Sequence, residues 1–374
     1  MISLRRPQHL KWLSILMLSF FLLSLSAFHF LRFKQQNGSS SANLFATTHD
    51  PDEHGFLAED EALNYCSHHR LDMYPARDRH RRIYDLFLIN TELDWLEIRL
   101  HELDQEVDFF VILESPFSFQ HTPKPLHFQD NLSQFEAFRH KIIYQVLDFT
   151  GEGSSIPDNK PWQHEIFTRN ALLDQVIASL EDDRAPNEGD VLLVSDIDEL
   201  PRPSTLITLR NCAFPPRTAL RSNMYYYSFQ WLHRGGQWDH PQATFFAGND
   251  TVKPDTLRSH HPHDIELYNA AWHCSSCFAT MSDLRNKITS FSHKEFNKPH
   301  MLEPERLLKV VRSGEDLFER SSELYDRVED NPDVPGYLLK EENQKKFAYL
   351  LDRDPPDANF KDVFSIAVDK AELH

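Results

Sequence analysis

The stretch Val191-Leu192-Leu193-Val194-Ser195-Asp196-Ile197-Asp198-Glu199-Leu200 carries the strongest signal in the chain. Its four leading apolar residues predict a buried strand, and two carboxylates one residue apart follow at the strand's end. Mg2+ and Mn2+ prefer carboxylate oxygens and commonly take only one or two from a protein. Asp196 and Asp198 are therefore predicted metal ligands. Acidic residues also serve as turn and cap residues after strands, so the tripeptide alone leaves that structural role open.

The segments around this strand alternate between strand and helix patterns. This alternation predicts an α/β sheet with substantial parallel pairing, which binds ligands beyond the carboxyl ends of its strands. Asp196 and Asp198 lie at that edge. The predicted strands are 83–89, 108–113, 141–147, the strand that ends at Asp196, and 270–280; the predicted helices are 93–103, 162–180 and 283–291.

The composition describes a folded, acidic protein. The chain has 374 residues, 40% of them hydrophobic, and a formal net charge of -18. That charge argues against a nucleic-acid binder that grips phosphates through a broad basic surface. The aromatic segment 219–232 is predicted to be extended, and its rings either stack on sugars or build a core.

The N-terminal region predicts a membrane anchor. Residues 13–31 hold no Lys, Arg, Asp or Glu and are flanked by basic residues, which predicts a transmembrane helix after a cytosolic tail of residues 1–12. The alternative is a cleaved signal peptide, because small residues lie near 24–27. A polar stem over 32–80, a catalytic domain over 81–355 and a polar tail over 356–374 are expected to follow.

Glycosylation motifs and cysteines are compatible with a secretory-pathway lumen. Asn37, Asn131 and Asn249 each begin an Asn-x-Ser/Thr sequence, and the cysteines are even in number. Sequence does not determine how the cysteines pair. The sequons and cysteines add modest support to a luminal catalytic part.

Taken together, a series of motifs resembles glycosyltransferase family 17, over roughly residues 84–352. A series in one order is far more specific than Asp-x-Asp. The motifs are Asp85-Leu86-Phe87, the run 92–103, Glu114-Ser115, Lys124-Pro125-Leu126, the run 139–144, Asp196-Ile197-Asp198-Glu199-Leu200-Pro201, the run 272–278, Tyr337-Leu338-Leu339 and Tyr349-Leu350-Leu351.

The resemblance implies a GT-A-like nucleotide-sugar-binding sheet with flanking helices, preceded by one transmembrane helix and a stem. It implies a single-pass type II Golgi membrane protein with a luminal catalytic domain. The implied enzyme is an inverting hexosyltransferase that moves N-acetylglucosamine from UDP-GlcNAc to a mannose of an N-linked glycan, in β-1,4 linkage. Mn2+ or Mg2+, held by Asp198 with Asp196 as ligand or ribose partner, would neutralise charge on the departing UDP.

Further residues are assigned to the donor side by the same resemblance. Glu165 and Arg169 lie four residues apart on one helix face, so they form either a simple ion pair or donor-site groups. Glu199 is placed with the donor-binding residues. His293 is predicted as a metal or diphosphate ligand, although a lone His is more often structural or exposed.

A separate carboxylate should take the proton from the attacking acceptor hydroxyl. Asp264 and Glu266 are preferred because they precede the Trp272-His273-Cys274 motif. Several other acidic residues are alternatives that surface or capping roles explain equally well: Glu199, Asp239, Asp283 and Glu295.

Two other functions compete. A haloacid-dehalogenase-like phosphatase also ends a strand in Asp-x-Asp, but it expects Thr or Val where Leu200 stands. A membrane-tethered, non-catalytic glycan-binding protein on the same fold is the second alternative, and the retained Asp196, Asp198 and Glu199 argue against it. Acceptor loops such as 151–161 and 235–262 have no clear family match, so acceptor identity rests on kinship.

Overall fold

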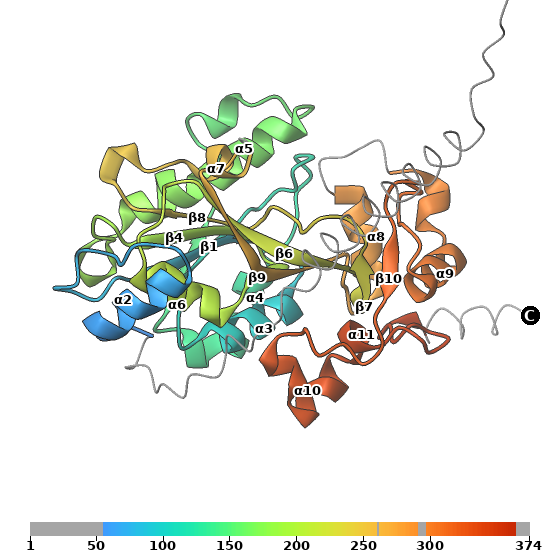
Figure 1. The fold of residues 1–374 in the computed structure, drawn as a ribbon. Coiled ribbons are helices and arrows are strands. Elements are labelled where there is room, and N and C mark those ends of the chain that lie inside the picture. The colour runs from blue at the N-terminus through green and yellow to red at the C-terminus, as the bar shows by residue number, and fades with distance from the viewer. Residues whose placement is uncertain (1–54, 260–261, 291–296, 364–374) are drawn as a thin grey trace, which may run out of the picture. The chain divides into compact units, whose positions relative to one another are not determined.

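The computed structural model describes residues 55–259, 262–290 and 297–363. Within these residues the strands form one mixed sheet. The strands are β1 (Ile83–Ile89), β2 (Phe109–Glu114), β3 (Ile142–Val146), β4 (Val191–Asp196), β5 (Glu199–Pro201), β6 (Thr218–Tyr226), β7 (Ser228–His233), β8 (Gln242–Phe245), β9 (Ile265–Ser275) and β10 (Tyr325–Arg327). The main path runs β10-β7-β6-β8-β4-β1-β2-β3, while β9 pairs with β6 and β5 pairs with β9 (Figure 1).

Helices cover this sheet, and the helices predicted after β1, β3 and β9 are confirmed. The helix predicted over 162–180 is α5, which continues as a π-helical turn (Leu172–Val176) and a short 3-10 turn (Ile177–Ser179). The α-helices are α2 (Glu59–His68), α3 (Leu93–Leu103), α4 (His127–Asp130), α5 (Pro161–Ala171), α6 (Pro203–Asn211), α7 (Pro254–Ser259), α8 (Met281–Ser290), α9 (Pro304–Ser313), α10 (Glu341–Lys346) and α11 (Ala348–Leu351).

The parallel half of the sheet confirms the α/β prediction. Strands β3, β2, β1 and β4 are parallel neighbours. Alternate residues of β1 enter different cores: Ile83 and Phe87 pack with residues of α3 and α6, whereas Tyr84 and Leu86 pack with α5 and the turn that follows it. Both faces of β1, β2 and β4 are therefore buried, which explains their nearly continuous apolar sequences, whereas the edge strand β3 is half-buried over its last three residues. In Figure 1, α5 lies above the strands and α3 below them.

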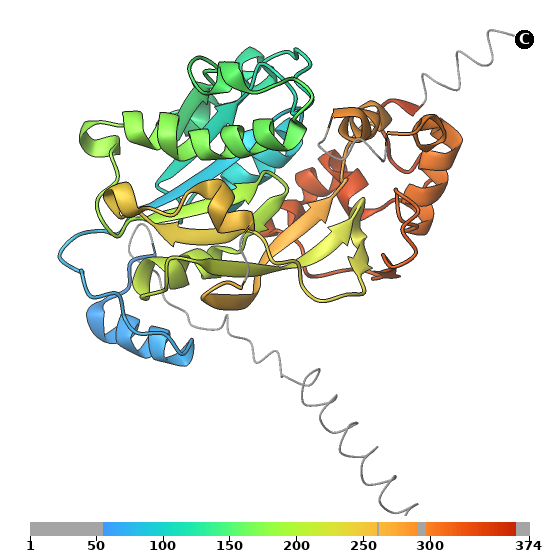
Figure 2. The ribbon, with the colours of Figure 1, turned by 90° about the horizontal axis from the view of Figure 1, so that it is seen from above.

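The other half of the sheet is mostly antiparallel and carries the aromatic segment. Strand β8 runs antiparallel to β4, and β6 and β7 form a hairpin. The rings of Tyr225, Tyr226, Tyr227, Phe229 and Trp231 are buried, so these aromatics build core. Figure 2 shows α8 to α11, in orange and red, gathered at this end of the sheet.

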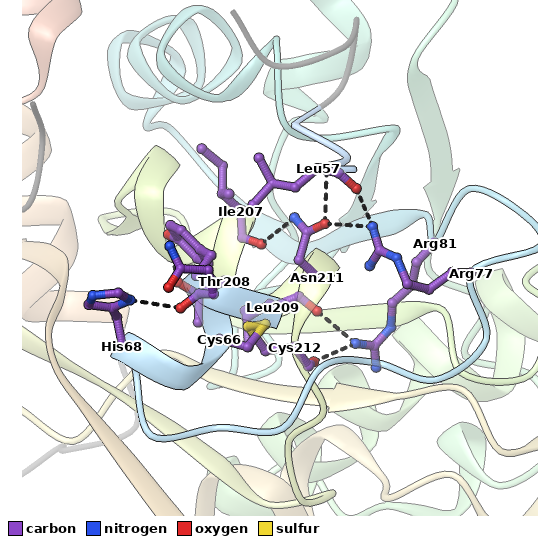
Figure 3. The surroundings of a disulfide bond; sticks show 12 residues. Leu57, Cys66, His68, Arg77, Arg81, Ile207, Thr208, Leu209, Asn211 and Cys212 are labelled. Atoms are coloured by element: carbon purple, nitrogen blue, oxygen red, sulfur yellow. Dashed lines mark hydrogen bonds between the residues drawn. A yellow bond between two sulfur atoms is a disulfide. The ribbon is translucent and has the colours of Figure 1, made fainter. Parts of the chain in front are cut away.

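Helix α2 joins the domain although its residues were assigned to the stem. Cys66 of α2 forms a disulfide with Cys212, which directly follows α6. Asn211 holds the segment before α2: its amide donates to the Gly55 carbonyl at 2.7 Å and accepts from the Leu57 N–H at 3.0 Å (Figure 3). The folded part thus includes residues before 81, where the domain was expected to start.

Arg81 fills the space between α6 and the sheet. Its guanidinium is buried and donates to the carbonyls of Gly189, Leu209 and Cys212 at 2.7 to 2.9 Å. It also lies 3.8 Å from the ring centroid of Tyr74. Figure 3 shows Arg81 reaching toward the Cys212 end of α6. This arginine therefore satisfies carbonyls that the helix end would otherwise leave without donors.

The predicted polar tail is also partly folded. Ala358 and Phe360 are buried, and the Asp362 carboxylate accepts from the backbone N–H of Met281 at 2.8 Å. The expected boundary at 356 therefore lies inside the folded part. Residues 364–374 are outside the described ranges.

The membrane anchor predicted over 13–31 lies outside the described residues, as do the predicted cytosolic tail and residues 32–54 of the stem. Within the described ranges, no helix combines the length and the apolar character that a bilayer crossing requires.

Candidate functional site

A cleft opens at the carboxyl ends of β1, β2 and β4. Parallel strands place their carboxyl ends along one edge, and register pairs Leu88 of β1 with Asp196 of β4 and Ile89 with Glu114 of β2. The lining residues are Leu88, Ile89, Asn90, Glu92, Leu113, Ser115, Phe117, Ser118, Phe119, Lys124, Thr168, Arg169, Asp196, Ile197, Asp198 and Lys287. The cleft is thus the crevice in which an α/β sheet binds ligands.

Arg99 of α3 holds the turn that follows β4. Its guanidinium is fully buried and donates to both oxygens of Asp85 on β1 at 2.6 Å. The same group donates to the Ser195 hydroxyl at 2.5 Å and to the Glu199 carbonyl at 2.8 Å. One arginine therefore connects β1, α3, β4 and the turn, which fixes where the Asp-x-Asp carboxylates lie.

Asp196 is bound by two arginines. Its carboxylate accepts from Arg169 Nη1 at 2.7 Å and from Arg258 Nη2 at 3.2 Å. Burial acts to raise the pKa of Asp196, but the charges of Arg169 and Arg258 outweigh it and hold the pKa well below its usual range. Arg169 also contacts Glu165 at 3.1 Å, so the predicted i, i+4 pair exists and extends to Asp196.

Glu199 lies behind the turn. It is 1% exposed and accepts from Arg258 Nη1 at 2.7 Å, from Trp238 Nε1 at 3.2 Å and from the Asp196 N–H at 2.9 Å. Burial acts to raise the pKa of Glu199, yet the charge of Arg258 lowers it to about 2. Neither Glu199 nor Glu165 lines the cleft, so both support the turn from outside the ligand space.

Asp198 has a different environment from Asp196. Its side chain is 15% exposed, and the Nε2 atom of His273 on β9 lies 3.9 Å from its Oδ2 atom. Burial raises the pKa of Asp198, and the negative charges of Asp196 and Glu199 add to that, although His273 and Lys287 act against it. Asp198 is therefore the Asp-x-Asp carboxylate that no arginine occupies within the described part of the chain.

The donor set around Asp198 fits a divalent cation that also binds a diphosphate. The described residues contain no cluster of three or more His, Cys, Asp or Glu side chains arranged around one point. Mg2+ sites often use one or two carboxylates and complete their coordination with phosphate and water, and one carboxylate meets that need. His293, the third predicted metal ligand, lies outside the described residues.

The preferred base residues do not reach the cleft. Glu266 pairs with Arg221 and accepts from Tyr268 at 2.7 Å, while Asp264 accepts from the Arg217 N–H at 3.2 Å. Glu266 lies seven residues before His273 on β9, and the usual strand rise places the two residues roughly 20 Å apart. Their assignment as catalytic base stays a prediction without geometric support. Asp283 bonds Thr280 at the start of α8, and Glu295 lies outside the described ranges.

Three positively charged side chains of the site were not predicted from the sequence. Arg258 of α7 binds both Asp196 and Glu199, Lys124 follows β2, and Lys287 lies on α8. The only signal for Lys124 was its place in a family motif, and Arg258 and Lys287 carried none. The fold gathers these positively charged groups around the carboxylates from distant parts of the chain.

Cys274 and Cys277 form a disulfide, a pairing that the sequence left open. It lies just beyond His273 on β9, because Cys274 is the next residue in that strand. The Cys274 N–H also donates to the Asp198 carbonyl at 3.1 Å. The cross-linked strand end therefore supports the backbone of the Asp-x-Asp turn.

Comparison with known proteins agrees with this geometry. The sequence profile of glycosyltransferase family 17 matches residues 9–354. The Homo sapiens beta-1,4-mannosyl-glycoprotein 4-beta-N-acetylglucosaminyltransferase is 27% identical over 312 residues, which cover 74% of this chain and 56% of the human protein. The Rattus norvegicus protein of the same name is 28% identical over 311 residues, which cover 74% of this chain and 55% of the rat protein. The chain spans about half the length of these curated relatives.

Proposed function

The chain belongs to glycosyltransferase family 17, and on that premise we propose that it transfers N-acetylglucosamine from UDP-GlcNAc to a mannose of an N-linked glycan. The donor, acceptor and β-1,4 linkage are taken from the names of the relatives. The observation that carries the proposal is the contrast at the end of β4: two arginines bind Asp196, whereas Asp198 lies at the cleft without one.

A GT-A-like arrangement of the donor is part of this proposal. The nucleotide would lie along the carboxyl ends of β1 and β2, where Asn90 and Ser115 line the cleft, and the diphosphate would lie beside Asp198. The partly exposed edge of Asp196, whose side chain is 38% exposed, suits a contact to the ribose. In this arrangement Arg169 and Arg258 hold Asp196 in place for that contact.

Mn2+ or Mg2+ belongs to the proposal, with Asp198 as the protein ligand that would hold it. When bound there, the cation would neutralise the charge that develops on the departing UDP. The chain's own residues orient this carboxylate: Arg99 fixes the turn, and the Cys274 N–H binds the Asp198 carbonyl. Burial around Asp198 and its 15% exposure limit the access of water to the reacting bond.

The acceptor would approach on the side of Trp238. The Trp238 ring is 37% exposed, donates to Glu199 and lies 5.5 Å from the His273 ring, which neighbours Asp198. Aromatic faces stack on the apolar sides of sugar rings, so Trp238 offers a place for an acceptor sugar next to the donor. Inversion requires attack from the face opposite the departing diphosphate, with a carboxylate taking the acceptor's proton.

A Golgi location in a single-pass type II topology completes the proposal. Its support is the basic-flanked apolar segment 13–31 and the two disulfides, which form in oxidising compartments.

The test is turnover of nucleotide sugars by the full-length protein, across a panel of donors, with Mn2+ or with EDTA. Metal-dependent hydrolysis of UDP-GlcNAc, and transfer to a mannose-containing N-glycan, is the expected result. No turnover and no nucleotide binding would remove the transferase proposal, and glycan binding alone would then favour the tethered binding protein.

A further inference from the structure

Lys124 carries a buried charge that the protein itself does not satisfy. It belongs to the loop that leads from β2 to α4 and lines the cleft. Its Nζ atom is inaccessible to solvent and makes no hydrogen bond to a described residue. Burial lowers the pKa of Lys124, although the negative charges of Glu114 and Glu92 act against this. Burying an ammonium without a partner is unfavourable, and buried charges in proteins are normally paired or bound to a ligand.

Lys287 approaches the same cleft from α8. The start of that helix is fixed by Asp362, whose carboxylate accepts from the N–H groups of Met281 and Ser282. Among the described residues, Lys287 makes no hydrogen bond or close ion pair. Its charge lies near those of Asp198 and Glu92, which outweigh burial and raise the pKa of Lys287. Lys287 therefore brings a second lysine to the cleft, beside the turn that carries Asp198.

The arginines of the site are already engaged. Arg169 binds Asp196 and Glu165, and Arg258 binds Asp196 and Glu199. These contacts fix the turn and leave the arginines little capacity for a ligand's charge. Lys124 and Lys287 differ from them. Both line the cleft, and the buried Nζ atom of Lys124 has no hydrogen-bond partner among the described residues.

We propose that Lys124 and Lys287 together bind the diphosphate of the donor, one from the loop after β2 and the other from α8. The inference rests on the proposed function and extends it to two residues of the donor site. Lysine binds phosphate as a point charge, which suits two ammonium groups that reach one ligand from separate elements. Part of the affinity for a nucleoside diphosphate should therefore persist when divalent cations are removed.

The experiment compares UDP with uridine, which lacks the phosphates. Lys124→Met and Lys287→Met keep the length of the side chain and remove the charge. Lys253→Met is the matched control, because Lys253 is a surface residue paired with Asp174 away from the cleft. Calorimetric titration of each full-length protein, with EDTA and with Mn2+, gives the dissociation constants.

Each cleft variant should bind UDP about tenfold more weakly than the parent protein, since one charged hydrogen bond is worth about 1.5 kcal/mol. The loss should appear in EDTA as well as in Mn2+. Uridine binding should be unchanged, and the control should match the parent with both ligands. If uridine binding falls as much as UDP binding, the lysines shape the site but do not bind the phosphates, and the inference is overturned.

Thermal unfolding without nucleotide separates ligand binding from a structural role. Lys124→Met should leave the Tm unchanged or raise it, because the substitution removes an unpaired buried charge. A Tm several degrees lower would show that the ammonium stabilises the fold and would contradict the inference. A parent protein that binds UDP while both variants bind it equally well overturns the inference alone. A parent protein that binds no UDP removes both this inference and the proposed function.

Discussion

Two chemically identical carboxylates, Asp196 and Asp198, have different environments because their neighbours differ. Asp196 meets two guanidinium groups and therefore ionises readily. Asp198 is buried near the carboxylates of Asp196 and Glu199, no arginine among the described residues binds it, and burial raises its pKa. A divalent cation would stabilise the ionised form of Asp198. It would stabilise ionised Asp196 much less, because two arginines already do so. The two environments therefore support the proposal that Asp198 would hold the metal, while the contacts of Asp196 with Arg169 and Arg258 organise the turn.

Asp198→Asn should lower metal-dependent donor turnover by about 100-fold or more, the usual cost of losing one charge-stabilising group. The pKa of Asp198 is raised in the folded state, so its contribution to stability is present at low pH and is lost as the pH rises through the folded pKa. At neutral pH the variant should therefore unfold at the same temperature as the parent or a higher one. Steady-state turnover and calorimetric melting check both points, and full activity in the variant would exclude a role for Asp198.

Asp196→Asn should, by contrast, lower the stability of the folded protein. The change leaves Arg169 and Arg258, both largely buried, without their shared negative partner. Because the Asp196 side chain is 38% exposed, solvent screens part of the effect, and a loss of about 1–3 kcal/mol is expected. Urea unfolding at neutral pH measures it. Equal stabilities for the Asp196 and Asp198 variants would contradict the distinction drawn between these two residues.

At the scale of elements, α5 contains a histidine that burial keeps neutral. His164 is 1% exposed, and both ring nitrogens lack hydrogen-bond partners among the described residues. Its ring stacks on that of His121 at 4.6 Å, and His121 lies 3.6 Å from Asp158. Burial lowers the pKa of His164, and the nearby charge of His121 lowers it further. This pair attaches α5 to the loop that contains Lys124.

The folded protein should lose stability as the pH falls below about 6.5, the ordinary pKa of histidine. Below that value the unfolded chain binds a proton at residue 164 that the folded chain does not accept until a lower pH is reached. His164→Leu should reduce this dependence, whereas His140→Leu on the surface should leave it unchanged. Urea unfolding between pH 7.5 and 5.5 provides the comparison, and identical slopes for parent and His164 variant would refute the explanation.

Helix α2 depends on a long-range covalent link. Only Ala62 and Cys66 of this helix are buried, so packing alone holds it weakly. Replacing Cys66 and Cys212 together by Ala should lower the free energy of unfolding by about 2–5 kcal/mol, because the bond closes a separation of 146 residues. Replacing Cys274 and Cys277 together by Ala should lower the free energy of unfolding by less, because these cysteines are only three residues apart. Denaturant titration of both double variants tests the order.

The sequence predicted best those elements whose own apolar pattern shows which of their faces are buried. Strands β1, β2 and β4 are nearly continuous apolar runs because both of their faces are covered, and α3 shows a clear helical period. Helix α2 was missed because its stability comes from Cys212, which lies far away in the sequence. The folded segment after 356 was missed for the same reason, since its contacts are with α8.

At the scale of the whole molecule, the site is assembled from segments distant in sequence. Asp196 and Asp198 could be predicted because one short segment carries both the strand and its carboxylates. Arg258 reaches this place through the packing of α7 on α5 and β4, His273 through the pairing of β9 with β5 and β6, and Lys287 through the docking of α8. No local pattern contains that information. Asp264 and Glu266 were chosen because they precede a motif on β9 in the sequence. They lie at the opposite end of that strand from His273, so closeness in sequence did not bring them to the site.

The arrangement around Arg81 has a consequence for proteolysis. The sequence Arg79-His80-Arg81-Arg82 would attract trypsin-like proteases in an unfolded chain. In the folded protein Arg81 is buried, and Asp190 pairs with both Arg79 and Arg82 at 2.6 and 3.1 Å. Digestion should therefore spare this segment until the domain unfolds. The most basic stretch before β1 would then report on folding quality, because cleavage there would mark molecules in which α6 has not closed over it.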